Sequence, residues 1–229
     1  MTNLFKYYME SINQSSPIVV YIDMDGVLAD LHGGQEDFIK KNIEDIFKDA
    51  DDTLHSLSKK EKNEILKNIF SKKSDLISSN KKEKVKNVYW TKFIEQKYFE
   101  KLDVLTQVKT LSDSLKLLKG KYPETRVEIL GSTGNQENHH KVSEQKKIWL
   151  KSNKNEIDIF FDRYNFVSGR KLKQNYATKN SILIDDTLSN CEEFRNAGGM
   201  AFHVDNNMNE LTNKLETYSK KIKGSDHEK

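Results

Sequence analysis

Two pairs of aspartates, each placed directly after an apolar stretch, are the residues of this sequence best suited to chemistry. Asp23 and Asp25 stand in the run Asp-Met-Asp-Gly-Val, and Asp185 and Asp186 close a second apolar stretch. Short, continuous, β-branched stretches of this kind predict buried strands of a parallel sheet. Ligands bind beyond the carboxyl ends of such strands. If the two strands are neighbours, we expect three or four of the carboxylates to converge there.

A group of converging carboxylates is unfavourable unless a proton or a cation neutralises it. Oxygen-only ligation suits Mg²⁺, which keeps several waters and often completes its shell with a substrate phosphate. A carboxylate can also attack phosphorus to give an aspartyl-phosphate, while a second acid protonates the leaving oxygen and later activates water. The two aspartate pairs therefore predict a Mg²⁺ site that supports phosphoryl transfer.

Residues that could hold a phosphate occur between the two aspartate pairs. The predicted strand 127–130 runs into Gly-Ser-Thr-Gly, which places the hydroxyls of Ser132 and Thr133 at another strand end. Three lysines precede the second aspartate pair and could form a cationic clamp: Lys171, Lys173 and Lys179. Each residue alone is as readily a turn or capping residue. The ordered set on successive strand ends is hard to explain by turns.

The pattern around these residues predicts an α/β fold. Strands are expected at residues 17–23, 127–130, 157–161, 181–185 and 200–204. Amphipathic spacing predicts a helix over residues 108–118, and the capping-box pattern of Ser189 and Glu192 predicts another that ends before Gly198. Strands that alternate with helices imply a Rossmann-like, three-layer core around a parallel sheet.

The stretch that follows the first aspartate pair lacks a convincing strand. Apolar residues at helical spacing predict helices near residues 38–47 and 65–70. We therefore expect a hydrolase core of residues 1–30 and 98–229, with a helical cap, residues 31–97, inserted after the first strand. Such a cap would exclude water during phosphoryl transfer and limit the size of the substrate.

Composition excludes several classes of protein. The chain has 229 residues and a net charge of +3, and only four of its 38 basic residues are Arg. Proteins that bind the phosphates and bases of nucleic acids favour Arg, so a dedicated nucleic-acid binder is not expected. No apolar run is long enough for a membrane span or a signal peptide. The single cysteine excludes a disulfide framework and suits a reducing cytoplasm.

Other reactive side chains are interpreted as structural. His139 and His140 are adjacent, cannot easily share one metal, and are expected in a surface loop. Cys191 is expected to be a packing residue and Trp149 a core residue. The lysine-rich stretch 81–86 could steer anionic substrates, but a solvated face of the insert is the simpler interpretation.

Taken together, the aspartates, hydroxyls and lysine resemble the motifs of the haloacid dehalogenase superfamily of phosphohydrolases. The match consists of four motifs in order: Asp23-x-Asp25-Gly26-Val27, Ser132 or Thr133, a lysine such as Lys173, and Asp185-Asp186. Within that superfamily, several short stretches look like 5'(3')-deoxyribonucleotidases and their phage and bacterial relatives. These stretches are DMDGVLADL, Trp90 followed by Tyr98-Phe99, the Glu-x-Lys-x-x-Trp run from Glu144 to Trp149, and LIDD.

The resemblance implies a role for each aspartate. Asp23 would be the nucleophile and a Mg²⁺ ligand. Asp25 would be the general acid and base, and would touch the metal through its backbone carbonyl. Asp186, supported by Asp185, would complete the metal site.

The resemblance also implies how a substrate would be held. Ser132 or Thr133, together with Lys173, would bind the phosphoryl oxygens. Leu31 and Trp90 fall where the family places the wall of its base pocket. The sequence departs from the family at position 31, where the animal enzymes carry an aromatic residue.

We therefore expect a Mg²⁺-dependent phosphomonoesterase that works through an aspartyl-phosphate. The resemblance implies nucleoside monophosphates, deoxy forms first, as its small-molecule partners, and a homo-oligomer is compatible with the sequence. One alternative is a phosphatase for another small phosphoester or for the 3'-phosphate end of a nucleic acid. An alternative of another class is a catalytically silent module that binds a metal or a partner in the acidic pocket.

Overall fold

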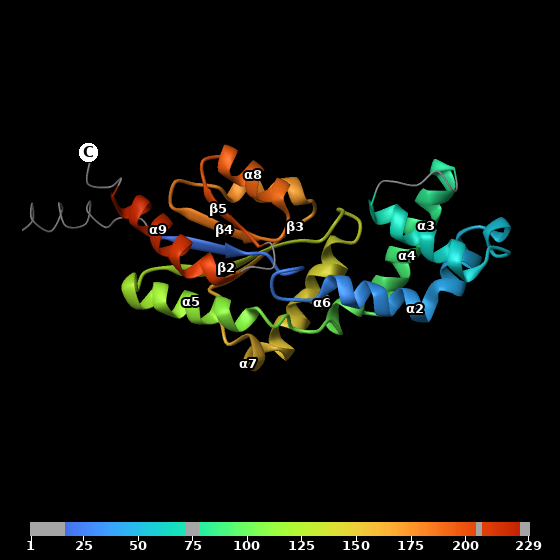
Figure 1. Cartoon of the computed structure of the whole chain (residues 1–229), viewed down its shortest axis with the longest axis horizontal. Coiled ribbons are helices and arrows are strands. Elements are labelled where there is room, and N and C mark those ends of the chain that lie inside the picture. The colour runs from blue at the N-terminus through green and yellow to red at the C-terminus, as the bar shows by residue number, and fades with distance from the viewer. Residues whose placement is uncertain (1–16, 72–77, 205–207, 225–229) are drawn as a thin grey trace, which may run out of the picture. The chain divides into compact units, whose positions relative to one another are not determined.

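A five-stranded parallel sheet organises the computed structural model, which describes residues 17–71, 78–204 and 208–224 (Figure 1). The strands are β1 (Val19–Ile22), β2 (Arg126–Ser132), β3 (Arg163–Val167), β4 (Ser181–Asp185) and β5 (Met200–His203). They lie in the order β3-β2-β1-β4-β5. The central strand β1 pairs in parallel with both β2 and β4, with Ile22 opposite Ile129 and Ile184. The strand order therefore reverses between β1 and β4, which are direct neighbours.

Helices cover both faces of this sheet. They are α5 (Val108–Lys121), α8 (Leu188–Asn196) and α9 (Leu211–Gly224), and the short helix α7 (Lys154–Ile157) contacts α5. Helices α5 and α9 lie on one side of the sheet and α8 on the other (Figure 1). On the α8 side, Cys191 and Phe194 pack with Tyr21 and Leu183 in a buried apolar cluster. The predicted α/β fold with three layers is confirmed.

One predicted strand is wrong. Residues 157–161 do not form a strand, because α7 ends at Ile157 and Asp158 then takes a left-handed conformation with φ of 51°. Phe160 is 72% exposed, and the strand β3 begins only at Arg163. Strand β3 lies at the edge of the sheet, where solvent reaches one side. Its sequence Arg-Tyr-Asn-Phe-Val is correspondingly mixed and carries no apolar strand signal.

The predicted capping box in α8 is also wrong. The residue that precedes the helix is Thr187, and its side chain makes no capping hydrogen bond. Asp185 instead accepts a hydrogen bond from the backbone N–H of Thr187 through its Oδ1, at 2.8 Å. The start of α8 is therefore tied to the second aspartate pair rather than to Ser189 and Glu192.

The chain divides into two compact units, and each has its own core. The sheet unit comprises Met1–Ala29, Val104–Ser143 and Lys151–Lys229, and the helical unit comprises Asp30–Asp103 and Glu144–Leu150. Within the sheet unit, residues 1–16, 205–207 and 225–229 lie outside the described part of the chain. No helix in the described ranges is both long enough and apolar enough to cross a membrane.

The helical unit has an aromatic core. Its helices are α2 (Leu31–Ala50), α3 (Lys59–Ser71), α4 (Ser79–Glu95) and the middle of α6 (His139–Ser152). The ring centroid of Phe38 on α2 lies between 4.7 and 5.2 Å from those of Tyr89, Phe93 and Tyr98. Helix α4 was not predicted from the sequence. It includes the stretch 81–86 and buries Val85 within it.

Candidate active site

Asp23 lies at the carboxyl end of the central strand. Its backbone N–H donates to the carbonyl of Ile184 at 2.9 Å, which continues the pairing of β1 with β4 and fixes Asp23 beside that strand. The side chain is buried. Its Oδ1 accepts a hydrogen bond from the backbone N–H of Met24 at 2.7 Å, and its Oδ2 lies 2.7 Å from the Nζ of Lys173. The carboxylate orientation is therefore set from two sides.

A tight turn follows Asp23 and brings the backbone close to Asp186. The carbonyl of Met24 accepts hydrogen bonds from the N–H groups of Leu28 and Ala29, both at 2.9 Å. Gly26 has φ of 76°, a conformation that L-residues with a side chain rarely adopt. A Cβ at Gly26 would also clash with the Oδ2 of Asp186. Half-buried Asp25 lies in this turn, next to Gly26.

Asp185 is fully buried and anchored by several donors. Its Oδ1 accepts from the N–H of Thr187 at 2.8 Å and from the Nδ2 of Asn190 at 3.0 Å. Its Oδ2 accepts from the Nζ of Lys173 at 2.7 Å and lies 3.1 Å from the same Asn190 nitrogen. These bonds make Asp185 the fixed member of the second aspartate pair. Asn190 was not singled out from the sequence, because it lies on α8 and only the fold brings it to Asp185.

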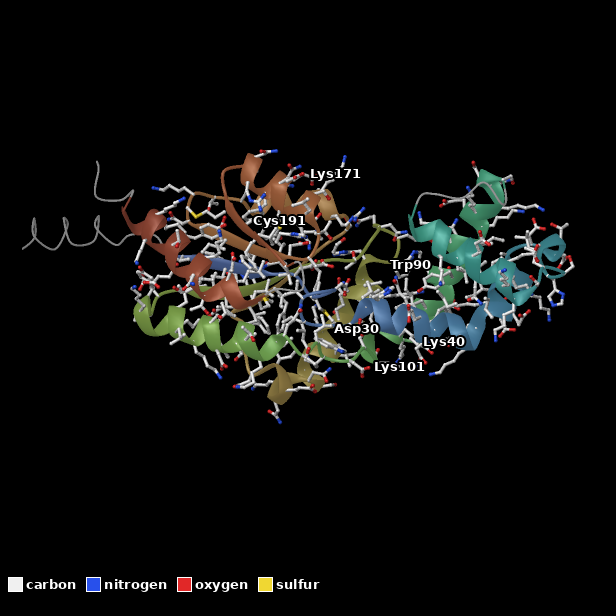
Figure 2. The ribbon with its side chains drawn as sticks, viewed as in Figure 1. Asp30, Lys40, Trp90, Lys101, Lys171 and Cys191 are labelled. Atoms are coloured by element: carbon white, nitrogen blue, oxygen red, sulfur yellow. The ribbon has the colours of Figure 1, made fainter. Side chains whose placement is uncertain are left out.

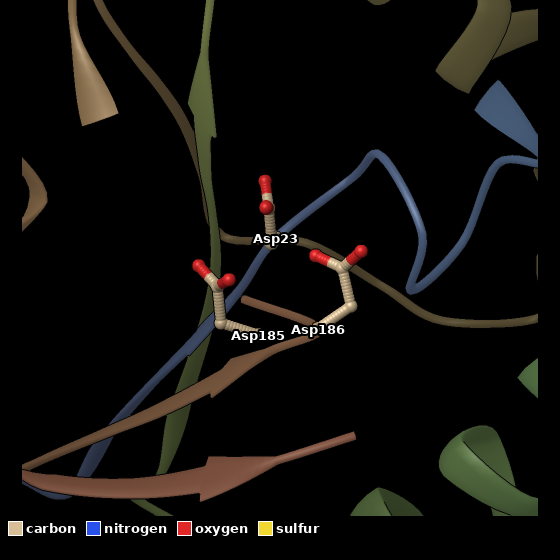
Figure 3. A group of neighbouring side chains, drawn as sticks. All are labelled: Asp23, Asp185 and Asp186. Carbon is tan, nitrogen blue, oxygen red and sulfur yellow. The ribbon is translucent and has the colours of Figure 1, made fainter. Parts of the chain in front are cut away.

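Asp23, Asp185 and Asp186 form one carboxylate cluster (Figure 3). One oxygen from each lies within 4.8 Å of the other two. Asp186 as a residue is exposed, but its carboxylate lies against Gly26. Desolvation, and then repulsion by Asp23 and Asp185, raises the pKa of Asp186 to about 7. The set of hard oxygen donors and its excess of negative charge fit a divalent cation such as Mg²⁺.

Lys173 is the cation that contacts two members of this cluster, Asp23 and Asp185. It lies in a short 3-10 helix, Arg170–Tyr176, and is only 1% exposed. Burial opposes its charge, but the attraction of Asp23 and Asp185 and its hydrogen bonds to them raise the pKa of Lys173 above its ordinary value. Of the three candidate lysines, the structure brings only this one to the aspartates. Lys171 and Lys179 are exposed (Lys171 is labelled in Figure 2).

The two candidate hydroxyls at the end of β2 have different surroundings. Thr133 is 7% exposed, and its Oγ1 lies 3.2 Å from the carbonyl of Val167 and 2.8 Å from the Nδ1 of His139. Ser132 is half-buried, and its Oγ accepts the N–H of Gly134 at 3.2 Å. The surface loop expected at the two histidines is wrong, because both lie in the first turn of α6.

The predicted pocket residues both belong to the helical unit. Leu31 is the first residue of α2 and is half-buried. Half-buried Trp90 on α4 stacks on Phe99 with ring centroids 6.4 Å apart and planes 5° apart. Trp149 is fully buried and donates from Nε1 to the carbonyl of Leu102 at 2.6 Å. This confirms the expectation that Trp149 is a core residue.

Cys191 is a packing residue, as expected. Its side chain is fully buried on α8 (Figure 2), and the Sγ donates to the carbonyl of Asp185 at 3.6 Å. Desolvation and the nearby charge of Asp185 raise the pKa of the thiol to about 12. A thiol with so high a pKa forms almost no thiolate near neutral pH, so it is not a nucleophile.

Solved structures of other proteins share this architecture, although the sequence comparisons found no relative. No protein-family model matches the sequence, and no curated protein does. Among solved structures, a haloacid dehalogenase-like family hydrolase from Xanthomonas campestris has 12% identity and a TM-score of 0.50, with 93% of this chain and 96% of that chain covered. A candidate haloacid dehalogenase-type hydrolase from Bacillus subtilis, YfnB, has 12% identity and a TM-score of 0.50, with coverage of 87% and 98%.

A candidate phosphatase from Clostridium difficile has 16% identity and a TM-score of 0.51, with 82% of this chain and 84% of that chain covered. At these identities the likeness concerns the fold, which extends over most of both chains. The aspartate cluster stands at the ends of β1 and β4, where such a sheet binds its ligands. This chain therefore has the fold of the haloacid dehalogenase-like hydrolases.

Proposed function

We propose that this protein is a Mg²⁺-dependent phosphomonoesterase that works through an aspartyl-phosphate on Asp23. The observation that carries this proposal is the carboxylate cluster of Asp23, Asp185 and Asp186 at the ends of β1 and β4, in which buried Lys173 contacts Asp23 and Asp185. A cluster of this charge needs a cation. A carboxylate held beside that cation is suited to attack a bound phosphoryl group.

Asp23 and Asp186, two members of the carboxylate cluster, would hold the ion, and the family resemblance adds the backbone carbonyl of Asp25 as a third oxygen. Asp185 would contribute by holding Lys173, because its own oxygens already accept four hydrogen bonds. When bound, Mg²⁺ would neutralise the cluster and withdraw charge from the phosphoryl oxygens. The Bacillus subtilis protein of the same fold was solved bound to magnesium, which supports this choice of ion.

The protein side chains would carry the two chemical steps. An Asp23 oxygen attacks phosphorus and the bond to the leaving oxygen breaks, while Asp25 donates a proton to that oxygen. Asp25 then accepts a proton from a water molecule, which attacks the phosphorus, releases phosphate and restores the Asp23 carboxylate. Lys173 keeps Asp23 in one orientation through the 2.7 Å contact between its Nζ and Oδ2, and supplies positive charge near the phosphoryl oxygens.

We further propose that the substrates are nucleoside monophosphates, with deoxy forms preferred. The support is the resemblance of the DMDGVLADL stretch and of Trp90 to the 5'(3')-deoxyribonucleotidases. The helical unit would act as a cap, and Leu31 and Trp90 would contact the base. A stacked pair such as Trp90 and Phe99 offers the flat apolar surface that a nucleobase needs.

A panel of phosphoesters tests both the proposed phosphomonoesterase activity and the proposed preference for nucleotides. Phosphate release is measured for 5'- and 3'-nucleoside monophosphates with ribose or deoxyribose, for sugar phosphates, and for an oligonucleotide with a 3'-phosphate. Each substrate is assayed with Mg²⁺ and with a chelator, and Asp23→Asn protein serves as the control for contaminating phosphatases. We expect Mg²⁺-dependent release that is fastest for a deoxynucleotide.

Two other outcomes would overturn different parts of the proposal. Faster release from sugar phosphates or from the oligonucleotide would overturn the nucleotidase assignment but leave the phosphomonoesterase. No release above the Asp23→Asn control on any substrate would overturn the enzyme and favour a silent metal-binding module.

A further inference from the structure

We propose that His139 is a positioning residue of the phosphate-binding loop, and that it leaves Ser132, rather than Thr133, to meet the phosphoryl group. This inference rests on the proposed function. It concerns Ser132, the last residue of β2, and the loop of residues 133–138, which joins β2 to α6. The observation that carries it is the contact of 2.8 Å between the Nδ1 of His139 and the Oγ1 of Thr133.

The donor and acceptor roles in this contact follow from the number of protons. A threonine hydroxyl carries one proton. The carbonyl of Val167, 3.2 Å from Oγ1, can only accept a hydrogen bond, so Thr133 must donate to it. The Nδ1 of His139 must then carry a proton and donate to Oγ1. Thr133 thus has no second proton to offer a phosphate, and its side chain is buried.

His139 is itself held firmly enough to act in this way. The hydroxyl of Ser143, one turn further along α6, donates to the carbonyl of His139 at 2.7 Å. Before the helix, Asn135 accepts the N–H of Asn138 through its Oδ1 at 3.0 Å. The side-chain bond from His139 to Thr133 therefore joins the start of α6 back to the end of β2 and closes the loop between them.

The closed loop sets the position of Ser132. Thr133 is pinned on both sides, because its N–H also donates to the carbonyl of Val167, at 2.9 Å. Ser132 immediately precedes it, and its Oγ accepts the N–H of Gly134 at 3.2 Å. The backbone just before Ser132 lies close to the nucleophile, since a Cβ built on Gly131 would lie 3.9 Å from the Oδ1 of Asp23. A loose loop would therefore hold the Ser132 hydroxyl in a less fixed position.

The test compares four variants. His139→Ala removes the donor, whereas His139→Asn keeps an N–H close to the position of Nδ1. Thr133→Val removes the acceptor with little change of shape. His140→Ala changes the neighbouring, exposed histidine and serves as the matched control.

Two readouts are used. The first is the affinity for inorganic phosphate in the presence of Mg²⁺, measured by calorimetry, together with KM and kcat. The second is amide hydrogen exchange of residues 134–138, which needs no activity.

We expect His139→Ala and Thr133→Val each to weaken phosphate binding about three- to tenfold, the range of one hydrogen bond, and to speed exchange in the loop. The double variant should lose no more than either single variant, because both remove the same bond. His139→Asn should recover most of the loss, and His140→Ala should match the unmodified protein. Ser132→Ala should weaken phosphate binding without faster exchange.

Failure of this inference is distinguishable from failure of the proposed function. Unchanged exchange and unchanged phosphate affinity in His139→Ala would overturn the positioning role, even in an active enzyme. Phosphate affinity lost in Thr133→Val but kept in both Ser132→Ala and His139→Ala would overturn the assignment of Ser132. If no phosphoester is hydrolysed, the exchange measurement still decides whether His139 holds the loop.

Discussion

The Nζ of Lys173 lies 2.7 Å from the Oδ2 of Asp23, and both side chains are buried. The same nitrogen lies 2.7 Å from Asp185. One ammonium group thus compensates two carboxylates, and a third, that of Asp186, lies within 4.8 Å of both. This surplus of negative charge is the physical basis for expecting a divalent cation. It also makes the stability of the sheet unit depend on charge balance at its ligand-binding end.

Removal of the Lys173 charge should be strongly destabilising. Lys173→Met keeps the bulk of the side chain but leaves Asp23 and Asp185 buried without their cation, which costs about 3–5 kcal/mol for a buried pair. Lys62→Met is the matched control. Lys62 is 2% exposed, but its partner Glu44 is exposed, so this loss should be much smaller. The free energy of unfolding is measured by urea titration, and equal losses in the two variants would contradict the role given to Lys173.

The raised pKa of Asp186 predicts how stability depends on pH. Asp186 has a pKa of about 7 in the folded chain and about 3.9 when unfolded. Between these values the folded state binds more protons than the unfolded state, so this group lowers the free energy of unfolding as pH rises. The metal-free protein should therefore lose stability from about pH 5 to pH 8 relative to Asp186→Asn.

Magnesium binding should show the opposite trend with pH. The ion competes with the proton on Asp186, so its affinity should rise as pH increases through about 7. Calorimetry in buffers with different ionisation enthalpies measures both the affinity and the protons released. An affinity that stays constant from about pH 6 to pH 8 would contradict the place of Asp186 in the metal site.

Gly26 should be essential for metal binding for a steric reason. A Cβ at this position would clash with the Oδ2 of Asp186, whereas a Cβ at Gly198 would meet nothing within 4 Å. Both glycines have positive φ, 76° and 95°, so both alanine variants carry a similar backbone strain of about 1 kcal/mol. Gly26→Ala should weaken Mg²⁺ binding at least tenfold, and Gly198→Ala should leave the affinity unchanged. A similar affinity in both variants would show that close approach to Asp186 is unimportant.

The acid role of Asp25 predicts a dependence on the leaving group. A ribose alkoxide needs a proton to leave, but a nitrophenolate does not. Asp25→Asn should therefore reduce kcat/KM for a nucleotide by about 10²–10⁴-fold and kcat/KM for nitrophenyl phosphate much less, because kcat/KM reports the steps up to formation of the aspartyl-phosphate. Rates on the two substrates are compared in one preparation. An equal reduction on both would show that Asp25 has some other role.

The strands that carry the aspartates could be predicted because they are buried on both faces. Residues 17–23 and 181–185 are apolar and β-branched, so their sequence alone distinguishes them from helices. Each ends in a carboxylate, and a buried strand tolerates such a charge only where a cation or hydrogen-bond donors compensate it. The order of the strands in the sheet could not be predicted from the sequence. It is the pairing of Ile22 with Ile184 in the structure that places Asp23 beside Asp185.

Other features of the structure could be recognised only once the fold was known. Strand β3 lies at the sheet edge and mixes polar with apolar residues over only five positions, so it carried no continuous apolar signal. Helix α4 is rich in lysine at its start and resembles a polar spacer, yet it buries Val85, Tyr89 and Phe93. The contacts of His139 and Asn190 with the site residues depend on helices that pack beside the strand ends, and no local pattern reveals them.

Trapping of the covalent intermediate tests the central claim most directly. The protein is mixed with nitrophenyl phosphate, whose leaving group needs no proton from Asp25, and with Mg²⁺, then quenched in acid, digested and analysed by mass spectrometry. We predict one phosphoryl group on the peptide that contains Asp23, present in larger amount in Asp25→Asn protein, where hydrolysis of the intermediate is slowed. Asp23→Asn protein should carry no label and should turn over at least about 10³-fold more slowly. Steady release of phosphate with no label on Asp23, or a label on another residue, would contradict the account.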